Sequence, residues 1–272
     1  MARGRSMLLA LSAAAGWMSM GCGGGEDAEP TDAASDDATM EAPARWAYEG
    51  ELGPERWGQI DAEFAACGSG TRQSPIDIPA DIAPGEFHSL AFDYAPAPAT
   101  LVDNGHTMQV NLTAGASELA IDGEIYSLVQ FHFHAHSEHA VDGTFKPLEL
   151  HLVHRSASGA LAVVGVFLDV GAENTALSPI FAGMASASLI PSALEADVDP
   201  SELLPASRLG WAYSGSLTTP PCTEGVGWHL MSSALQVSEE QLEAFTSRHH
   251  TNRRPVSANT GVVTGGSIRR PL

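Results

Sequence analysis

The chain has 272 residues, of which 44% are hydrophobic, and it carries a formal net charge of -20 with an isoelectric point near 4.7. A chain of this length can bury the core of one domain, or at most two. The acidic balance lacks the basic footprint that nucleic-acid binding requires, so we expect no nucleic-acid partner.

The first 21 residues have the pattern of a secretory signal peptide. Arg3 and Arg5 precede an apolar run from Met7 to Met20, and the run ends in small residues. A permanent transmembrane anchor is the alternative, but at about 1.5 Å per residue so short a helix does not cross a hydrocarbon core of ~30 Å. We therefore expect residues 1–21 to direct export and to be removed.

Cys22 directly follows this leader. Gly21 and Cys22 resemble the lipobox of bacterial lipoproteins, in which a small residue precedes the cysteine that receives the lipid, although Ser19 stands where Leu is preferred. The sequence predicts a lipidated Cys22 that anchors the protein in the periplasm or cell envelope, with no other membrane contact. Cleavage without lipidation stays open.

Residues 22–44 consist largely of Gly, Ala, Asp and Glu. Such a segment buries too little apolar surface to offset the entropy of ordering, so it predicts a flexible acidic tether. Aromatic residues begin at Trp46, and we expect the folded domain to span residues 45–272.

Within this domain the sequence predicts mainly strands. Short runs rich in β-branched and aromatic residues are punctuated by Gly, Pro, Asp and Asn. The clearest lie at Thr107–Leu112, Tyr126–His134, Leu148–His154 and Leu161–Val170, and the last, apolar on both faces, is typical of a central strand. The best helix candidate is Ser238–Arg248, where Ser238 can cap the first turn with Gln241 three residues on. We expect a mainly β (α+β) single domain.

The chain contains three cysteines, an odd number for an exported protein. Lipidation of Cys22 would leave Cys67 and Cys222 as a pair. A bridge closing so long a loop would contribute roughly 5 kcal/mol in the chain-entropy model. Two unpaired thiols remain the alternative.

Six of the eleven histidines fall between residues 132 and 154. Residues two apart in a strand share a face, so His132 and His134 project together while Phe131 and Phe133 project to the other side. By the same rule Glu149 and His151 share a face of a second strand. A neighbouring strand could thus bring a third imidazole to the first two.

Three neutral imidazoles are the ligand set of catalytic zinc, which keeps a fourth position for water. Gln130 and Glu149 are the candidates to hold the second ring nitrogen of such ligands. On spacing alone, satisfied core histidines or a surface metal patch are the competing interpretations.

Several ordered motifs extend the pattern over nearly the whole domain: WAYEG, GPERW, RQSPIDI, DNGH, QFHFH, SEH, ELHLVH, LAVVGVFL, GSLTTPPC and NRRPV. In this order and at these separations they resemble the α-carbonic anhydrase family. The resemblance implies a large, twisted, mostly antiparallel central β-sheet with short flanking helices, and zinc (Zn2+) as the cofactor. It also implies reversible hydration of carbon dioxide to bicarbonate and a proton, through attack by zinc-bound hydroxide.

Matched position by position, the resemblance assigns a role to each candidate site residue. The implied zinc ligands are His132, His134 and His151, with Gln130 and Glu149 behind them. Thr218 would accept a hydrogen bond from the hydroxide and donate to Glu138, since a Thr that donates to a carboxylate can only accept elsewhere. The carbon dioxide pocket would comprise Val153, Val163, Leu217, Thr219 and Trp228. Without the resemblance, TTPP is an ordinary rigid turn, and the apolar residues are indistinguishable from core.

His106 matches the family's proton shuttle, with Tyr48, Asn104 and Gln130 in positions that hold connecting waters. Taken alone, a His after Asn-Gly is more often a turn residue. In bacterial members Cys67 and Cys222 match a disulfide pair, which would brace the loop that carries Thr218. His139 and His154 match positions of structural type.

Departures from the family pattern are Ala135 and His136 before SEH, Lys146 in place of Tyr, and SANTG after NRRPV. None is a ligand position.

Two rivals of the enzyme interpretation are a non-catalytic binding domain, which would typically have lost a zinc histidine, and a zinc-storage lipoprotein. The sequence leaves a homodimer open.

Overall fold

The computed structural model describes residues 46–87, 90–259 and 261–266. The chain divides into two units between Ala42 and Pro43, and every described residue belongs to the second. The predicted leader, Cys22 and the acidic tether lie outside the described residues. Among the described residues, no helix is long and apolar enough to cross a membrane.

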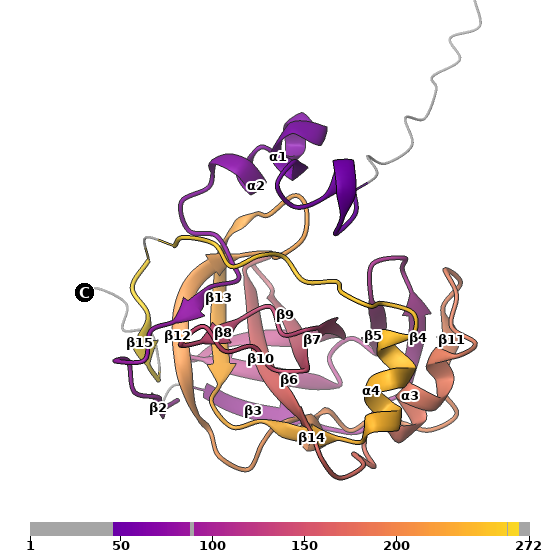
Figure 1. Cartoon of the computed structure of the whole chain (residues 1–272). Coiled ribbons are helices and arrows are strands. Elements are labelled where there is room, and N and C mark those ends of the chain that lie inside the picture. Colours follow the sequence, from indigo (N-terminus) through magenta and orange to yellow (C-terminus); the bar gives the residue numbers. More distant parts are fainter. Residues whose placement is uncertain (1–45, 88–89, 260, 267–272) are drawn as a thin grey trace, which may run out of the picture. The chain divides into compact units, whose positions relative to one another are not determined.

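A 13-stranded sheet forms the centre of the described domain (Figure 1). From edge to edge its strands are β11 (Ser192–Ala193), β4 (Ala99–Asp103), β5 (Met108–Leu112), β7 (Glu124–Ala135), β9 (Leu148–Ser156), β10 (Leu161–Val170), β13 (Glu224–Met231), β12 (Leu209–Ser216) and β15 (Thr264–Gly265). Four more strands join it: β2 (Gly85–Glu86) on β12, β14 (Leu235–Val237) on β10, and β3 (Leu90–Tyr94) on β6 (Ser117–Ile121), which pairs with β7. β1 (Asp77–Ile78) and β8 (Ala140–Val141) form a separate parallel pair.

Among the described pairings of the large sheet, the parallel ones are those of β10 with β13 and of β10 with β14. The prediction of a mostly antiparallel sheet is therefore confirmed. The helices are short, as expected: α1 (Trp57–Ile60), α2 (Ala66–Ser69), α3 (Ser178–Met184) and α4 (Glu239–Thr246), with 3-10 turns at Gly50–Leu52, Ala62–Phe64 and Pro200–Leu203. Helices α3 and α4 lie together beside the β4 end of the sheet (Figure 1).

The predicted elements are found with small shifts at their ends. The strand over Leu161–Val170 is confirmed, with seven consecutive buried residues and neighbours on both sides. Helix α4 begins after Ser238, whose side chain accepts from the Gln241 backbone N–H. In turn the Gln241 side-chain oxygen accepts from the Ser238 backbone N–H. Thr107 lies just before β5, and its hydroxyl donates to the carbonyl oxygen of Phe133.

An irregularity in β7 sets which side chains face which side of the sheet. Its register against β9 shifts between Leu128 and Gln130, so one extra residue is accommodated at Val129. Because side chains alternate in a strand, the shift places Leu128 and Phe131 in the same core. Gln130 and His132 are left to face the other side.

Each face of the sheet has its own apolar cluster. The main core contains Phe131, Phe133 and Phe245, and the smaller cluster contains Val163, Tyr213 and Trp228. His132, His134 and His151 lie on the side of the smaller cluster, since the ring centroids of His151 and Trp228 are 4.9 Å apart.

Candidate metal centre

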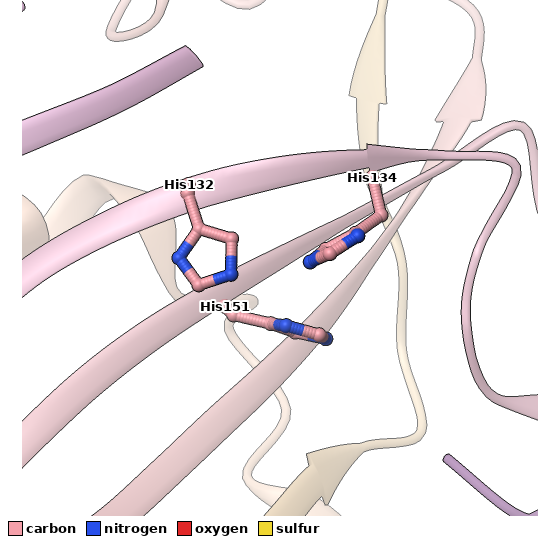
Figure 2. A group of neighbouring side chains, drawn as sticks. All are labelled: His132, His134 and His151. Atoms are coloured by element: carbon pink, nitrogen blue, oxygen red, sulfur yellow. The ribbon is translucent and has the colours of Figure 1, made fainter. Parts of the chain in front are cut away.

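His132 and His151 stand opposite each other in the antiparallel pairing of β7 and β9, and His134 pairs with Glu149 two residues further along. This register brings the three imidazoles together, and Figure 2 shows their rings turned toward one another. The ring centroids are 5.0 Å apart for His132 and His134, 5.2 Å for His132 and His151, and 4.6 Å for His134 and His151.

Each of the three rings has one nitrogen held by an acceptor. His132 Nδ1 lies 2.8 Å from Gln130 Oε1, His134 Nδ1 lies 2.7 Å from the carbonyl oxygen of Asn252, and His151 Nε2 lies 2.8 Å from Glu149 Oε1. Because these oxygens accept, the nitrogens facing them carry the protons. The lone pairs therefore sit on Nε2 of His132, Nε2 of His134 and Nδ1 of His151.

The site fits a zinc ion. One ligand atom from each ring lies within 4.8 Å of the other two. His134 Nε2 is buried and has no hydrogen-bond partner among the described residues, so a lone pair is left that a cation would satisfy. Burial and the neighbouring imidazoles hold the pKa of His132 well below its usual value, and burial lowers that of His134. Three neutral nitrogen donors are the set that suits catalytic zinc.

Glu149 anchors a buried network behind His151. Its Oε1 also accepts from His139 Nδ1 at 2.7 Å, and His139 Nε2 lies 2.6 Å from the Tyr213 hydroxyl, which donates to Ser74 Oγ at 2.8 Å. Although burial opposes it, the charges and hydrogen bonds of His139 and His151 hold the pKa of Glu149 well below its usual value. His139, Glu149 and His151 also cluster closely, but their mutual hydrogen bonds make them a supporting network.

Glu138 lies beside the open side of the triad. Its Oε2 is 3.5 Å from His134 Nε2 and 3.9 Å from His151 Nδ1. Its Oε1 accepts from the Arg254 backbone N–H at 2.8 Å, whereas Oε2 has no hydrogen-bond partner among the described residues. Thr218 is buried, but the structure places no hydrogen bond between it and Glu138, so the expected relay stays a prediction.

An apolar wall adjoins the triad. Val153, Val163 and Trp228 stand side by side at one register of β9, β10 and β13. Leu217 packs against the same cluster, and the Thr219 carbonyl accepts a hydrogen bond from the Cys222 backbone N–H at 2.8 Å.

The predicted disulfide is present, with Cys67 and Cys222 bonded at 2.08 Å.

His106 lies in a second small region, next to a cavity of about 300 Å³ that Tyr48 and His249 also line. Its ring stacks on Trp46 with centroids 3.6 Å apart, and its backbone N–H donates to Asn104 Oδ1. Burial, together with His249, lowers the pKa of His106 against the opposing effect of Asp103. The Asn104 side chain is thus engaged in the turn that positions His106.

The positions that depart from the family pattern lie in different parts of the domain. His136 is exposed, and its peptide bond with Ala135 is cis. Lys146 forms an ion pair with Asp169 at 2.8 Å. None of these residues touches the three imidazoles through a contact that the structure describes.

Sequence reasoning missed Asn252 and Arg254, which support the site. Asn252 holds His134 through its carbonyl and fixes the adjacent strand by accepting from the Ala135 N–H and donating to the Phe133 carbonyl. Arg254 orients Glu138 through its backbone N–H. The available signal was the NRRPV motif, in which both residues stand.

Comparisons with known proteins agree with this geometry. Residues 52–262 match the family model of eukaryotic-type carbonic anhydrases. A carbonic anhydrase of Klebsiella pneumoniae is 43% identical over 222 residues, which are 81% of this chain and 90% of that protein, and one of a Nostoc species is 42% identical over 79% and 85%. The solved α-carbonic anhydrase of Thermovibrio ammonificans, in complex with the inhibitor sulfanilamide, is 40% identical with a TM-score of 0.78, covering 82% of this chain and 100% of that one.

Proposed function

The chain belongs to the eukaryotic-type, or α-type, carbonic anhydrase family, and from this premise we propose that it catalyses the reversible hydration of carbon dioxide with zinc as cofactor. The observation that carries the proposal is the set of three lone-pair nitrogens on His132, His134 and His151 within 4.8 Å of one another. Carbon dioxide and bicarbonate are accordingly the proposed substrates, and a zinc-storage role would not require the apolar wall beside the triad.

A zinc ion held by these nitrogens would supply a hydroxide nucleophile near neutral pH, because such sites lower the pKa of water to about 7, the figure known for carbonic anhydrases themselves. The chain's own contribution is to fix the donors. Gln130, Glu149 and the Asn252 carbonyl select the tautomer of each ring by accepting from the opposite nitrogen.

We propose that Thr218 orients the nucleophile. Glu138 Oε2 is buried and has no hydrogen-bond partner among the described residues, while Arg254 holds its other oxygen. If the Thr218 hydroxyl donates its one hydrogen bond to Oε2, its oxygen can only accept a hydrogen bond from the nucleophile. The lone pair of the nucleophile then points toward substrate, where Val153, Val163 and Trp228 offer an apolar surface suited to carbon dioxide.

Each turnover leaves a proton to be exported. We propose that His106 carries it to solvent, with Tyr48, Asn104 and Gln130 holding the connecting waters. An imidazole titrates near neutral pH and can both accept and release a proton. The ring stack on Trp46 supports this role, because it holds His106 beside a cavity that reaches Tyr48.

The direct test is a stopped-flow hydration assay on the zinc-loaded protein, with and without sulfanilamide, which inhibits the Thermovibrio relative. We expect hydration that requires zinc and is suppressed by sulfanilamide. A protein that holds one zinc per chain and shows no hydration above the buffer blank would instead be a binding or storage protein.

We further propose that residues 1–21 direct export and that Cys22 carries the lipid anchor. Both lie outside the described residues, and the support is the leader pattern alone. Mass spectrometry of the mature N-terminus tests this proposal. An unmodified N-terminus downstream of Cys22 would exclude the lipid.

A further inference from the structure

A cavity of about 400 Å³ lies away from the triad, bordered by the β6–β7 turn, the β9–β10 connection, β12 and β13. His229 lines it. Side chains alternate along β13, so His229 projects to the face opposite Trp228, and its ring contacts Phe87 of the main core. The cavity is therefore separated from the candidate metal centre by the sheet itself.

His229 is 3% exposed and forms no hydrogen bond among the described residues. Its neighbour His154 is equally buried, yet both of its ring nitrogens are held, Nε2 by the Tyr94 hydroxyl at 2.6 Å and Nδ1 near the Ala162 carbonyl at 3.3 Å. Buried polar groups are nearly always paired in folded proteins. Nε2 of His229 faces the open space over Gly227, where a partner can reach it.

The walls of the cavity define the charge of such a partner. Asp122 and Glu124 line it, and none of the described lining residues is Lys or Arg. Ile121 and Ala162 supply apolar surface, and the turn at Asp122 and Gly123, both with positive φ, fixes the rim in the manner of a tight hairpin. Burial lowers the pKa of His229 to about 4, so its ring is neutral near pH 7 and does not repel a cation.

We propose that this cavity binds a small organic cation, an arylalkylamine whose ammonium group lies toward Asp122 and Glu124 and whose far end carries a hydroxyl that pairs with His229. The ring between these two groups packs on Ile121 and Ala162. Each part of the ligand corresponds to one part of the wall, and an anion of the same shape is rejected by the two acidic side chains.

The test uses three probes on the zinc-loaded protein: 4-hydroxybenzylamine, benzylamine and 4-hydroxybenzoate. Binding is followed by NMR through the His229 ring resonances, up to about 10 mM, which corresponds to roughly 0.3 kcal/mol for each of some nine heavy atoms. We expect saturable binding of 4-hydroxybenzylamine, weaker binding of benzylamine, which lacks the hydroxyl, and none of 4-hydroxybenzoate.

Gly227→Val supplies the matched blocking variant. A Cβ at this position meets nothing nearer than 3.9 Å, where it approaches His229 Nε2, so the added methyls extend into the cavity beside His229. We expect at least a tenfold loss of 4-hydroxybenzylamine affinity, about 1.4 kcal/mol, with carbon dioxide hydration and melting temperature unchanged. His229→Leu should remove the advantage of the hydroxylated probe over benzylamine.

Three results would overturn the proposal. The first is no saturable shift at His229, which would leave water as the sole occupant. The second is equal binding by wild type and Gly227→Val, or shifts at His134 in place of His229, which would move the ligand to the candidate metal centre. The third is binding of 4-hydroxybenzoate as tightly as of the amine.

Discussion

The carbonyl oxygen of Asn252 lies 2.7 Å from His134 Nδ1, although the two residues are 118 positions apart in the chain. This contact fixes the proton on Nδ1 and leaves Nε2 as the lone pair that points into the triad. The C-terminal segment thus controls the chemistry of a side chain in the middle of the sheet. Two predictions follow from the ends of this contact.

His134→Ala should abolish zinc binding and carbon dioxide hydration, because two imidazoles hold the metal weakly. The variant should remain folded, since it removes one hydrogen bond, from Nδ1 to the Asn252 carbonyl, and leaves the backbone pairing of β7 with β9 in place. Zinc per chain and stopped-flow hydration are the measurements. His136→Ala, two positions away and exposed, is the matched control and should keep both. Full activity with stoichiometric zinc in His134→Ala would refute the ligand assignment.

Asn252→Ala should lower the free energy of unfolding by about 1 to 3 kcal/mol, since it leaves the Ala135 N–H without its partner and removes one of the two hydrogen bonds that the Phe133 carbonyl accepts. The carbonyl that holds His134 is retained, so zinc should still bind, but less tightly once β7 loses this brace. Urea unfolding and zinc competition with a chelator measure the two effects. An unchanged unfolding midpoint would show that water replaces the Asn252 side chain.

The sequence predicted the parts of the site that depend on local periodicity. His132 and His134 share a face because they are two apart, and β10 was recognised by its continuous apolar run. The accommodation of Val129 in β7 leaves no such signal, although it determines which face the upstream half of the strand presents. Contacts such as Asn252 with His134 depend on how distant segments meet, which spacing alone does not encode. For the same reason the unpaired state of His229 could only be found in the structure.

Breaking the Cys67–Cys222 bridge should lower the free energy of unfolding. It closes a loop with a sequence separation of 155, for which the chain-entropy model gives an upper figure of about 5 kcal/mol. The double variant Cys67→Ser, Cys222→Ser should therefore unfold at lower urea than the wild type. Reduced wild-type protein should match it, because the change is the same loss of a cross-link. Two titratable thiols in the denatured, unreduced wild type would exclude the bridge altogether.

Stability should fall as the pH drops from about 6.5 toward 4, and His229 is one cause. Burial lowers its pKa to about 4 in the folded state, whereas the unfolded value is near 6.5. Between these values the unfolded chain binds a proton that the folded chain does not, so the free energy of unfolding rises with pH across this window. His229→Leu should flatten the slope, while a variant at the exposed His250 should not. Urea unfolding at pH 4.5 and 7 makes the comparison. Equal slopes in wild type and His229→Leu would contradict this assignment.

His106 provides the test that separates proton export from the chemistry of hydration. Its ring stacks on Trp46 and is not one of the three imidazoles of the triad. His106→Ala should therefore leave zinc content, folding and kcat/KM nearly unchanged. Maximal turnover in dilute buffer should fall by about 10-fold or more. A positioned acid or base usually contributes about 10²-fold or more to the rate.

Added imidazole should restore turnover in His106→Ala, because a diffusible base of similar pKa can take the proton that the side chain no longer accepts. The matched control is His249→Ala, which removes the neighbour that helps lower the pKa of His106 while keeping the carrier itself. That variant should shift the pH profile of turnover upward without lowering its plateau by a comparable factor. If turnover of His106→Ala in weak buffer equals that of the wild type, the proton leaves by another route, and the exposed His136 is the next residue to replace.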